Sequence, residues 1–398
     1  MSGRVLAWAL YDLANTFFAI AMLSFHFPLW IVEDRGGTPL AFSVAIGASM
    51  GCVALIMPFC GALSDAGRAW TKGLRWTTYA CAAATACVAA APSLTTALAL
   101  FVFANMAYQL GTIFYDALLW QVAPPGQLAS VSSIGAAFGY LGSAVGLLVL
   151  SAVSAWGGRA AAFPAAAFCF LLFAWPSFLT LADPPPPAAR PAWSAVWREA
   201  ISRFRHTVGY AKSLAGLWQY LWAAFFSLNA INTVLVFMGV YAKQRMRLAE
   251  GDMVRFFVFS QIFAILGALV FGRYSIRWGG KRTLMRIWVG WMAALTLLAA
   301  RPTLAGLWVA GPVIGFCLGS TWATGRVLLV QLAPKDRLAE LFGLAGVFAR
   351  ASAIVGPIVW GALIGPRGEH TELGLLWLLA LLAIGLSLLR QVPEASPA

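Results

Sequence analysis

The dominant feature of this sequence is a series of apolar segments, each long enough to cross a lipid bilayer. A spanning helix needs about 20 mostly apolar residues, because the hydrocarbon core of a bilayer is about 30 Å thick. Hydrophobic residues make up 61% of the 398-residue chain and charged residues 10%, which leaves too little polar surface for a water-soluble globule. We therefore predict an all-α integral membrane protein with twelve transmembrane helices. They are expected at residues 5–32, 40–63, 74–92, 94–122, 129–155, 160–182, 215–242, 252–275, 283–300, 303–331, 338–364 and 371–390.

One long connection, residues 183–214, divides the chain into an N-terminal six-helix bundle (1–182) and a C-terminal six-helix bundle (215–398). It opens with Asp183 and a run of prolines, which cannot continue a helix. Apolar residues then recur at helical spacing, with basic residues between them: Trp193, Trp197, Ile201, Phe204 and Val208. This pattern predicts an amphipathic helix on the membrane surface. A solvated linker is the alternative.

The net charge of +13 is better explained by membrane topology than by a nucleic-acid partner. Basic loops of membrane proteins stay in the cytoplasm. Here the connections on the side of the two termini carry roughly twice as many Lys and Arg residues as the others. We therefore expect a multi-pass protein of the cell (inner or plasma) membrane with both termini cytoplasmic. The basic cluster at 243–255 is the one loop that argues against this orientation.

The sequence offers no arrangement typical of catalysis. Its three histidines are scattered, and its six cysteines form no Cys-x-x-Cys pair. A Gly-x-Ser-x-Gly motif and a phosphate-binding loop are also missing from the sequence. We therefore expect neither an enzyme nor a bound cofactor or metal.

The second half of the chain repeats the first. The stretch from Asp116 to Pro124 matches Arg326 to Pro334, and Trp8 and Asn15 recur as Trp222 and Asn229 at nearly the same offset. Duplicated six-helix halves around a cavity at the membrane midplane are typical of secondary transporters.

Two sequence motifs resemble known families. The stretch Gly61-Ala-Leu-Ser-Asp65-Ala-Gly67-Arg68 resembles the cytoplasmic loop signature of the major facilitator superfamily, and a second copy begins at Gly272, with Ile276 in place of the acid. The resemblance implies two pseudo-symmetric six-helix bundles in the major facilitator fold. It also implies a gate at the inner face that uses Asp65 and Arg68, with the stronger clamp at Asp65.

A narrower resemblance comes from the first helix. Its stretch Trp8-Ala-Leu-Tyr11-Asp12-Leu-Ala-Asn15-Thr16 is similar to the opening of the autophagy-related vacuolar effluxer family and its bacterial relatives. Those members of the family with an implied function export amino acids from the vacuole. The resemblance therefore implies export of an amino-acid-like solute.

Polar residues inside the predicted spans are candidate functional residues, because ionisable groups at membrane depth are costly. Helical spacing places them in stripes on the first, fourth, seventh and tenth helices, which line the central cavity in the superfamily. An Arg in the eleventh helix, Arg350, could bind the carboxylate of a substrate through its planar fork, or serve as a counter-ion for Asp12. The predicted substrate- or ion-binding residues are Tyr11, Asp12, Asn15, Asn105, Gln109, Tyr115, Asn229, Asn232 and Arg350. For Asp12 the alternative is a helix–helix hydrogen bond, and for Asn229 it is simple helix packing.

Asp116 and Arg326 occupy equivalent positions of the repeat. We expect them to act in gating, and Asp116 to couple transport to protons if it takes up a proton when its partner leaves. The alternative is that both are static anchors near helix ends. A stripe of glycines in the fifth helix (Gly135, Gly139, Gly142 and Gly146) predicts close helix approach.

Together these features predict a secondary active transporter that moves a small polar or zwitterionic solute by alternating access, in the direction of export. The expected partners are a small-molecule substrate, the lipid bilayer, and protons or another cation; we expect a monomer. Efflux of a drug or lipid is one alternative. A non-transporting membrane sensor or scaffold is another.

Overall fold

The structure is a computed structural model that describes residues 2–67, 70–124, 128–183, 193–214, 216–334, 337–365 and 368–394. These residues form helices joined by short connections, and no strand occurs among them. The chain divides into two compact units. Unit 1 comprises Met1–Gly37 and Val44–Arg203, and unit 2 comprises Thr38–Ser43 and Phe204–Ala398.

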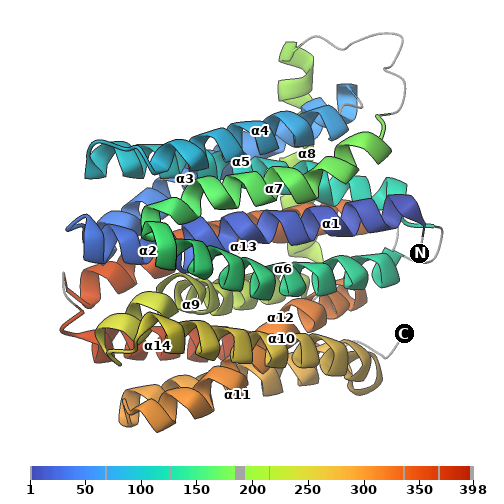
Figure 1. The fold of residues 1–398 in the computed structure, drawn as a ribbon. Helices are drawn as coiled ribbons and strands as arrows, with labels where there is room; N and C mark the ends of the chain where they lie inside the picture. Colours follow the sequence, from blue (N-terminus) through green and yellow to red (C-terminus); the bar gives the residue numbers. More distant parts are fainter. Residues whose placement is uncertain are drawn as a thin grey trace. The chain divides into compact units, whose positions relative to one another are not determined.

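Unit 1 begins with a long first span (Figure 1). This span consists of α1 (Gly3–Phe18), the π-helical stretch η1 (Ala19–Ser24), the short α2 (His26–Leu29) and a second π-helical stretch η2 (Trp30–Asp34). The backbone departs from helical geometry at Phe25, where φ is -133° and ψ is -72°. The other helices are α3 (Pro39–Gly67), α4 (Trp70–Val88), α5 (Leu94–Val122), α6 (Leu128–Gly157), the 3-10 turn η3 (Arg159–Ala161) and α7 (Ala162–Thr180).

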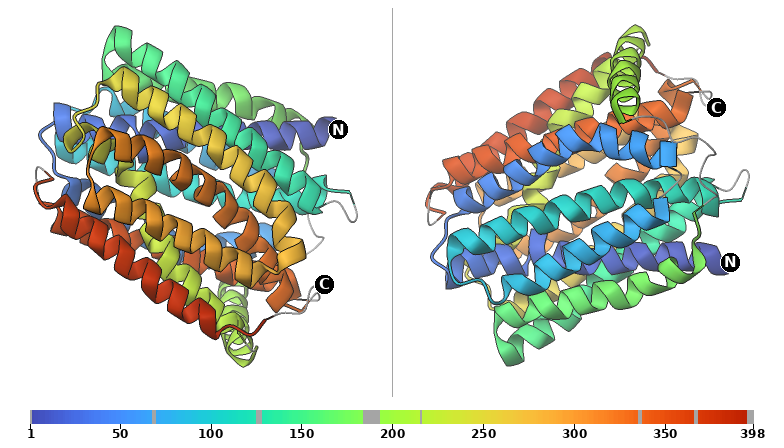
Figure 2. Two further views of the ribbon diagram at one scale, coloured as in Figure 1. Left: turned by 90° about the horizontal axis from the view of Figure 1, so that it is seen from below. Right: turned by 90° about the horizontal axis from the view of Figure 1, so that it is seen from above.

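The long connection contains the helix α8 (Trp193–Ser213), and unit 2 resumes within it, at Phe204 (Figure 2). Its long helices are α9 (Leu217–Gln244), α10 (Glu250–Trp278), α11 (Gly280–Ala300), α12 (Leu304–Leu332), α13 (Leu338–Leu363) and α14 (Thr371–Gln391). The first residues of α3 also belong to this unit, where Ser43 Oγ donates a hydrogen bond of 2.7 Å to the backbone oxygen of Pro357 in α13.

The sequence repeat is also present in the helix ends. The fourth span of each half, α5 in unit 1 and α12 in unit 2, is 29 residues long. Each follows a hydroxyl N-cap: Ser93 accepts a hydrogen bond from the backbone N–H of Thr96, and Thr303 from that of Gly306. These caps satisfy orphan N–H groups and so fix where each helix begins. The two halves are therefore built on the same local signals.

Eleven helical spans in the described residues are long and apolar enough to cross a membrane. The predicted fold class, an all-α membrane protein, is confirmed, but the count of twelve spans is not. The helix that falls short is α4, which contains polar residues such as Thr71, Lys72 and Arg75 in its first turns.

The predicted bounds of α4, 74–92, also differ from the observed ones, because the helix runs from Trp70 to Val88. The helix begins four residues earlier because Asp183, three residues after the end of α7, caps it from a distance in sequence. The two carboxylate oxygens of Asp183 accept hydrogen bonds from the backbone N–H of Thr71 at 2.6 Å and of Lys72 at 3.1 Å. A carboxylate on these N–H groups also complements the helix dipole.

Glycines allow the tightest helix contacts in both units. On α6, a Cβ atom at Gly142 would lie 2.5 Å from the backbone oxygen of Leu13 in α1. On α12, a Cβ at Gly319 would lie 1.9 Å from the backbone oxygen of Ala264 in α10. Only glycine fits at such distances, and close approach of this kind is how small residues stabilise helix pairs within a membrane.

Candidate functional site

Asp12 lies half-buried on α1, against the backbone of α6. Its Oδ1 accepts a hydrogen bond of 3.2 Å from Nδ2 of Asn15, one turn along the same helix. On the facing helix, a Cβ at Gly139 would stand 2.9 Å from the other carboxylate oxygen. Gly139 thus leaves the room that the carboxylate occupies, and Asn15, which is itself buried, fixes its orientation.

The aromatic residues around Asp12 form a packed cluster in unit 1. Trp8 stacks on Tyr115 with a ring separation of 4.5 Å, and its Nε1 donates to the backbone oxygen of Tyr115 at 3.2 Å. The ring of Tyr11 lies 5.2 Å from that of Tyr115, and its hydroxyl shares a hydrogen bond of 2.7 Å with Thr78 Oγ1 in α4. Both tyrosines are buried. Their contacts join α1, α4 and α5.

The polar stripe of α5 divides into buried and accessible members. Asn105 is fully buried, and its Nδ2 donates a hydrogen bond of 2.7 Å to Ser49 Oγ in α3. Gln109 is half-buried, whereas Asp116 is exposed near the end of the helix. Asn105 therefore links two helices of unit 1, whereas Gln109 and Asp116 keep part of their surface uncovered by other protein atoms.

Unit 2 shows the same division. Asn229 is 1% exposed, and its Oδ1 accepts a hydrogen bond of 2.8 Å from the backbone N–H of Gly356, just before Pro357 in α13. Asn232 is half-buried and donates to Ser352 Oγ at 3.1 Å. The geometry of Asn229 is that of a helix-packing residue, which is the simpler of its two predicted roles.

The two arginines predicted for the second half lie at different depths. Arg350 is half-buried in α13, where its Nη1 lies 3.5 Å from the backbone oxygen of Gly346, one turn earlier. Arg326 is exposed near the end of α12, as its repeat partner Asp116 is near the end of α5. Of the predicted loop gate, Arg68 lies outside the described residues, as does the side chain of Asp65.

The second copy of the loop motif has a contact that sequence reasoning missed. Lys281 Nζ, at the start of α11, donates to the backbone oxygens of Arg390 at 2.8 Å and Val392 at 2.5 Å. Arg282 forms a two-pronged ion pair with Glu394, at 2.9 and 2.5 Å. This pair holds the pKa of Glu394 below its ordinary value, since the Arg282 hydrogen bond and charge favour the ionised carboxylate. These basic residues therefore fix the chain that follows α14.

Glu394 is the repeat counterpart of Asp183. The two acids follow the last helix of their half, and their spacing equals that of Gly61 and Gly272 in the two loop motifs. Asp183 binds the backbone at the start of α4, and Glu394 binds a side chain at the start of α11. Applying the repeat offset to Asp183 would have identified the pair from the sequence.

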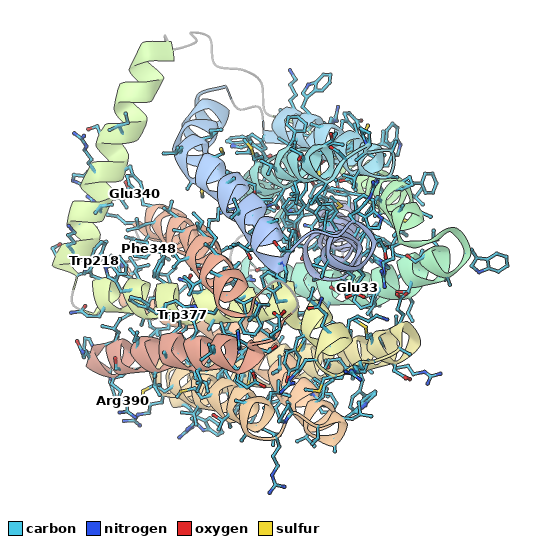
Figure 3. All side chains as sticks on the ribbon, turned by 90° about the vertical axis from the view of Figure 1, so that its left-hand side faces the viewer. Glu33, Trp218, Glu340, Phe348, Trp377 and Arg390 are labelled. Atoms are coloured by element: carbon cyan, nitrogen blue, oxygen red, sulfur yellow. The ribbon has the colours of Figure 1, made fainter. Side chains whose placement is uncertain are left out.

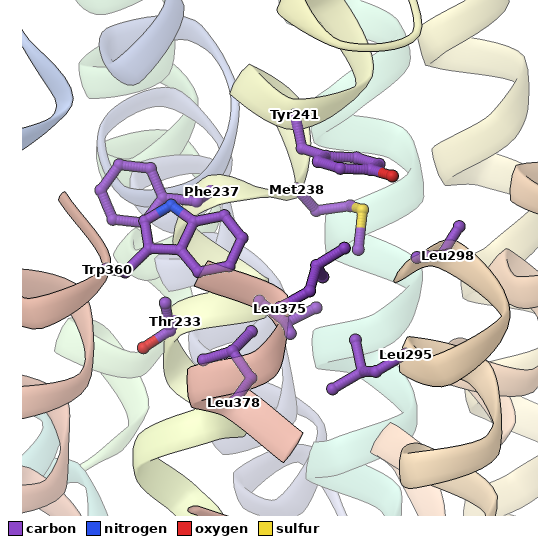
Figure 4. A pocket seen from close by; sticks show the side chains of 10 residues that line it. Thr233, Phe237, Met238, Tyr241, Leu295, Leu298, Trp360, Leu375 and Leu378 are labelled. Atoms are coloured by element: carbon purple, nitrogen blue, oxygen red, sulfur yellow. The ribbon is translucent and has the colours of Figure 1, made fainter. Parts of the chain in front are cut away.

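A small cavity inside unit 2 is too small to hold a solute. It lies between α9, α11, α13 and α14 (Figure 4), and its volume of about 10 Å³ is the size of one water molecule. Its lining is mostly apolar: Thr233, Val234, Phe237, Met238, Tyr241, Leu295, Leu298, Trp360, Leu375 and Leu378. Within the part of the chain that the structure describes, no three His, Cys, Asp or Glu side chains are grouped as metal ligands would be.

Comparison with known proteins agrees with the fold. A family model described as "Vacuole effluxer Atg22 like" matches residues 125–396. A Bacillus subtilis (strain 168) protein, described as the uncharacterized MFS-type transporter YxiO, is 24% identical; the match covers 98% of this chain and 94% of that one. An uncharacterized protein of Aquifex aeolicus (strain VF5) is also 24% identical, over 96% of this chain and 95% of the relative.

Two solved structures share the architecture. The nucleoside transporter NupG superposes with a TM-score of 0.74 at 15% identity, over 98% of this chain and 100% of that one. A bacterial homolog of the human lysosomal transporter Spinster, in an inward-facing and unoccupied conformation, superposes with a TM-score of 0.71 at 14% identity, over 100% of this chain and 98% of that one. At these identities the likeness shows the fold alone.

Proposed function

Because the chain belongs to the vacuole effluxer Atg22-like family, we propose that it exports a small polar or zwitterionic solute, such as an amino acid. It is a membrane transporter of the major facilitator type. Transport proceeds by alternating access, with the bundles 1–182 and 215–398 rocking about a midplane binding site. The protein acts in the cell (inner or plasma) membrane, with both termini in the cytoplasm.

The observation that carries the proposal is the carboxylate of Asp12 inside the first spanning helix, Gly3–Asp34. A charged group at that depth is expensive and is retained where it binds a solute or an ion. Asp12 is half-buried, whereas its neighbours Tyr11 and Asn15 are buried and engaged in hydrogen bonds. Its carboxylate is thus positioned by α1 and α6 while part of the residue stays accessible. A carboxylate in this setting suits the ammonium group of an amino acid.

Accessibility separates solute-binding residues from positioning residues in the predicted set. The half-buried members supply the contacts to the solute, with Arg350 binding its carboxylate: Asp12, Gln109, Asn232 and Arg350. The buried members position them through helix packing: Tyr11, Asn15, Asn105, Tyr115 and Asn229. The mixture of an acid, a base and amides favours a zwitterion over a purely cationic or anionic solute.

Gating falls to the charged residues near helix ends. Asp116 and Arg326 are exposed at equivalent positions of α5 and α12 and exchange partners during the cycle. Asp116 takes up a proton when its partner leaves, which couples export to the proton gradient. Asp65 and Arg68 form the loop gate at the inner face.

The experiment that tests the proposal is flux in proteoliposomes, with a panel of labelled amino acids, nucleosides and cationic drugs. We expect amino-acid counterflow by the wild-type protein and its loss, by roughly tenfold or more, in Asp12→Asn, because a charge-assisted hydrogen bond contributes about 1.5–3 kcal/mol. Asp252→Asn is the matched control, since Asp252 is exposed at the start of α10. Flux of drugs alone, or equal amino-acid flux in Asp12→Asn, would contradict the proposal. An absence of flux for every solute would favour a sensor or scaffold.

A further inference from the structure

The connecting helix α8 is held to unit 2 at its C-terminal end. It ends at Ser213, and the spanning helix α9 begins at Leu217, so this end of α8 lies at the membrane boundary. Lys212 Nζ lies 5.1 Å from the ring of Trp218, and the guanidinium of Arg337 lies 4.4 Å from the ring of Tyr210. Figure 3 labels Trp218. These cation–π contacts fix the depth at which α8 leaves the bundle.

The apolar stripe of α8 is covered at one end and open at the other. Thr207 and Ala211 are buried, at 5% and 0% exposure. One turn before them, at helical spacing on the same stripe, Phe204 is 36% exposed, and Ile201 is 43% exposed. Phe204 and Ile201 are therefore not covered by other parts of the protein. At the level of the bilayer surface, lipid is the nearest apolar medium that can cover them.

Positive charge borders this stripe. Arg205 and Lys212 are seven residues apart in sequence, which places them along one edge of the helix, beside the apolar stripe. Arg205 and Lys212 are exposed. The helix contains a single acid, Glu199. A row of cations beside an apolar stripe is the pattern that binds anionic lipid headgroups while the stripe enters the acyl region.

We propose that α8 is an interfacial lipid-binding helix, which docks on the anionic phospholipid surface through Ile201, Phe204, Arg205 and Lys212. The occupant is the headgroup layer of the bilayer in which the protein resides. This docking holds the connection between the two halves against the membrane, so that the charge of the surrounding lipid acts on the transporter. It does not depend on which solute is carried.

The test is hydrogen–deuterium exchange of the full-length protein in nanodiscs, made with phosphatidylcholine alone or with added phosphatidylglycerol. We expect slower exchange over residues 201–213 in the anionic discs, and a loss of that difference at high salt, which screens exposed charges. Each cation contributes roughly fivefold, equivalent to about 1 kcal/mol, so Arg205→Gln with Lys212→Gln should abolish the difference. Phe204→Ser should weaken protection in both kinds of disc.

The control is Arg255→Gln with Arg301→Gln, which removes the same charge from two exposed positions outside α8 and should leave the difference intact. Equal exchange in the two kinds of disc would overturn the proposal. So would protection of residues 201–213 that is already complete in detergent, because it would assign the stripe to a second copy of the chain. Both readouts are independent of transport activity.

Discussion

Replacing Gly142 with alanine tests whether α1 and α6 depend on their close contact. The new Cβ would stand 2.5 Å from the backbone oxygen of Leu13 and 2.8 Å from its Cα. Carbon atoms pack at about 3.5–4.0 Å, so the two helices must separate by about 1 Å. Because the clash is with backbone, rotation of a side chain cannot relieve it.

The expected magnitude follows from two opposing effects. Overpacking a tight core costs typically 1–3 kcal/mol, whereas alanine is more favourable than glycine in a helix by roughly 0.5–1 kcal/mol. With a backbone clash the first effect dominates, and we expect a net loss of about 2 kcal/mol in the free energy of unfolding. For a chain of this size, that corresponds to a drop in Tm of about 2 °C.

Gly146→Ala is the matched control on the same face of α6. Its new Cβ would meet Phe17 at 3.5 Å, an ordinary contact, so the helix propensity of alanine should leave the stability unchanged or slightly raised. Thermal unfolding of the two variants in the same detergent, followed by tryptophan fluorescence, gives the comparison. If Gly142→Ala unfolds at the same temperature as Gly146→Ala, the argument from close approach is refuted.

Three other changes probe the anchors and the carboxylate site. Gly139→Ala would place a Cβ 2.9 Å from Asp12 Oδ2; the carboxylate can turn away, so we expect impaired solute flux with little change in Tm, and unimpaired flux would contradict the positioning of Asp12 by α6. Asp183→Asn should cost about 1 kcal/mol and speed amide exchange at Thr71 and Lys72, since the amide keeps only one of the two acceptor oxygens and has no charge to complement the helix dipole; unchanged exchange there would refute the cap. The Arg282 pair lowers the pKa of Glu394, so its stabilisation is present above the ordinary pKa of a carboxyl and is lost as the pH falls through the lowered value. Glu394→Gln should therefore speed proteolysis of the C-terminal end at neutral pH and make little difference at acid pH, and equal rates at neutral pH would count against the ion pair.

The membrane fold was predictable because one physical constraint dominates it. Bilayer thickness sets the length of each apolar segment, so helices such as α5 and α12 were placed within one or two residues of their observed ends. The boundaries of α4 were not predictable from local sequence, because its cap comes from Asp183, more than a hundred residues away. The break at Phe25, by contrast, has a local signal in Pro28, which lacks the N–H that would bond to the carbonyl of Ser24.

The candidate site was only partly predictable, for a related reason. Helical spacing identifies which residues share a face, but it does not reveal which of them meet a neighbouring helix. Asn105 and Gln109 share a stripe of α5, yet Asn105 is buried against Ser49 and Gln109 is half-accessible. The role of Gly139 also depends on its partner: the glycine stripe was evident in the sequence, but the carboxylate of Asp12 opposite it was not.

The anchors at Asp183 and Glu394 have a consequence for modularity. In each half, the acid that follows the last span hydrogen-bonds to the start of the third span. Asp183 binds α4 within unit 1, and Glu394 binds α11 within unit 2. The chemistry has diverged, from a backbone cap in one half to an arginine pair in the other, while the place of the acid has been kept. Neither half borrows residues from the other to finish this part of its structure. For this connection each half is self-contained, so duplication of a six-helix half would carry the acid and its partner helix together.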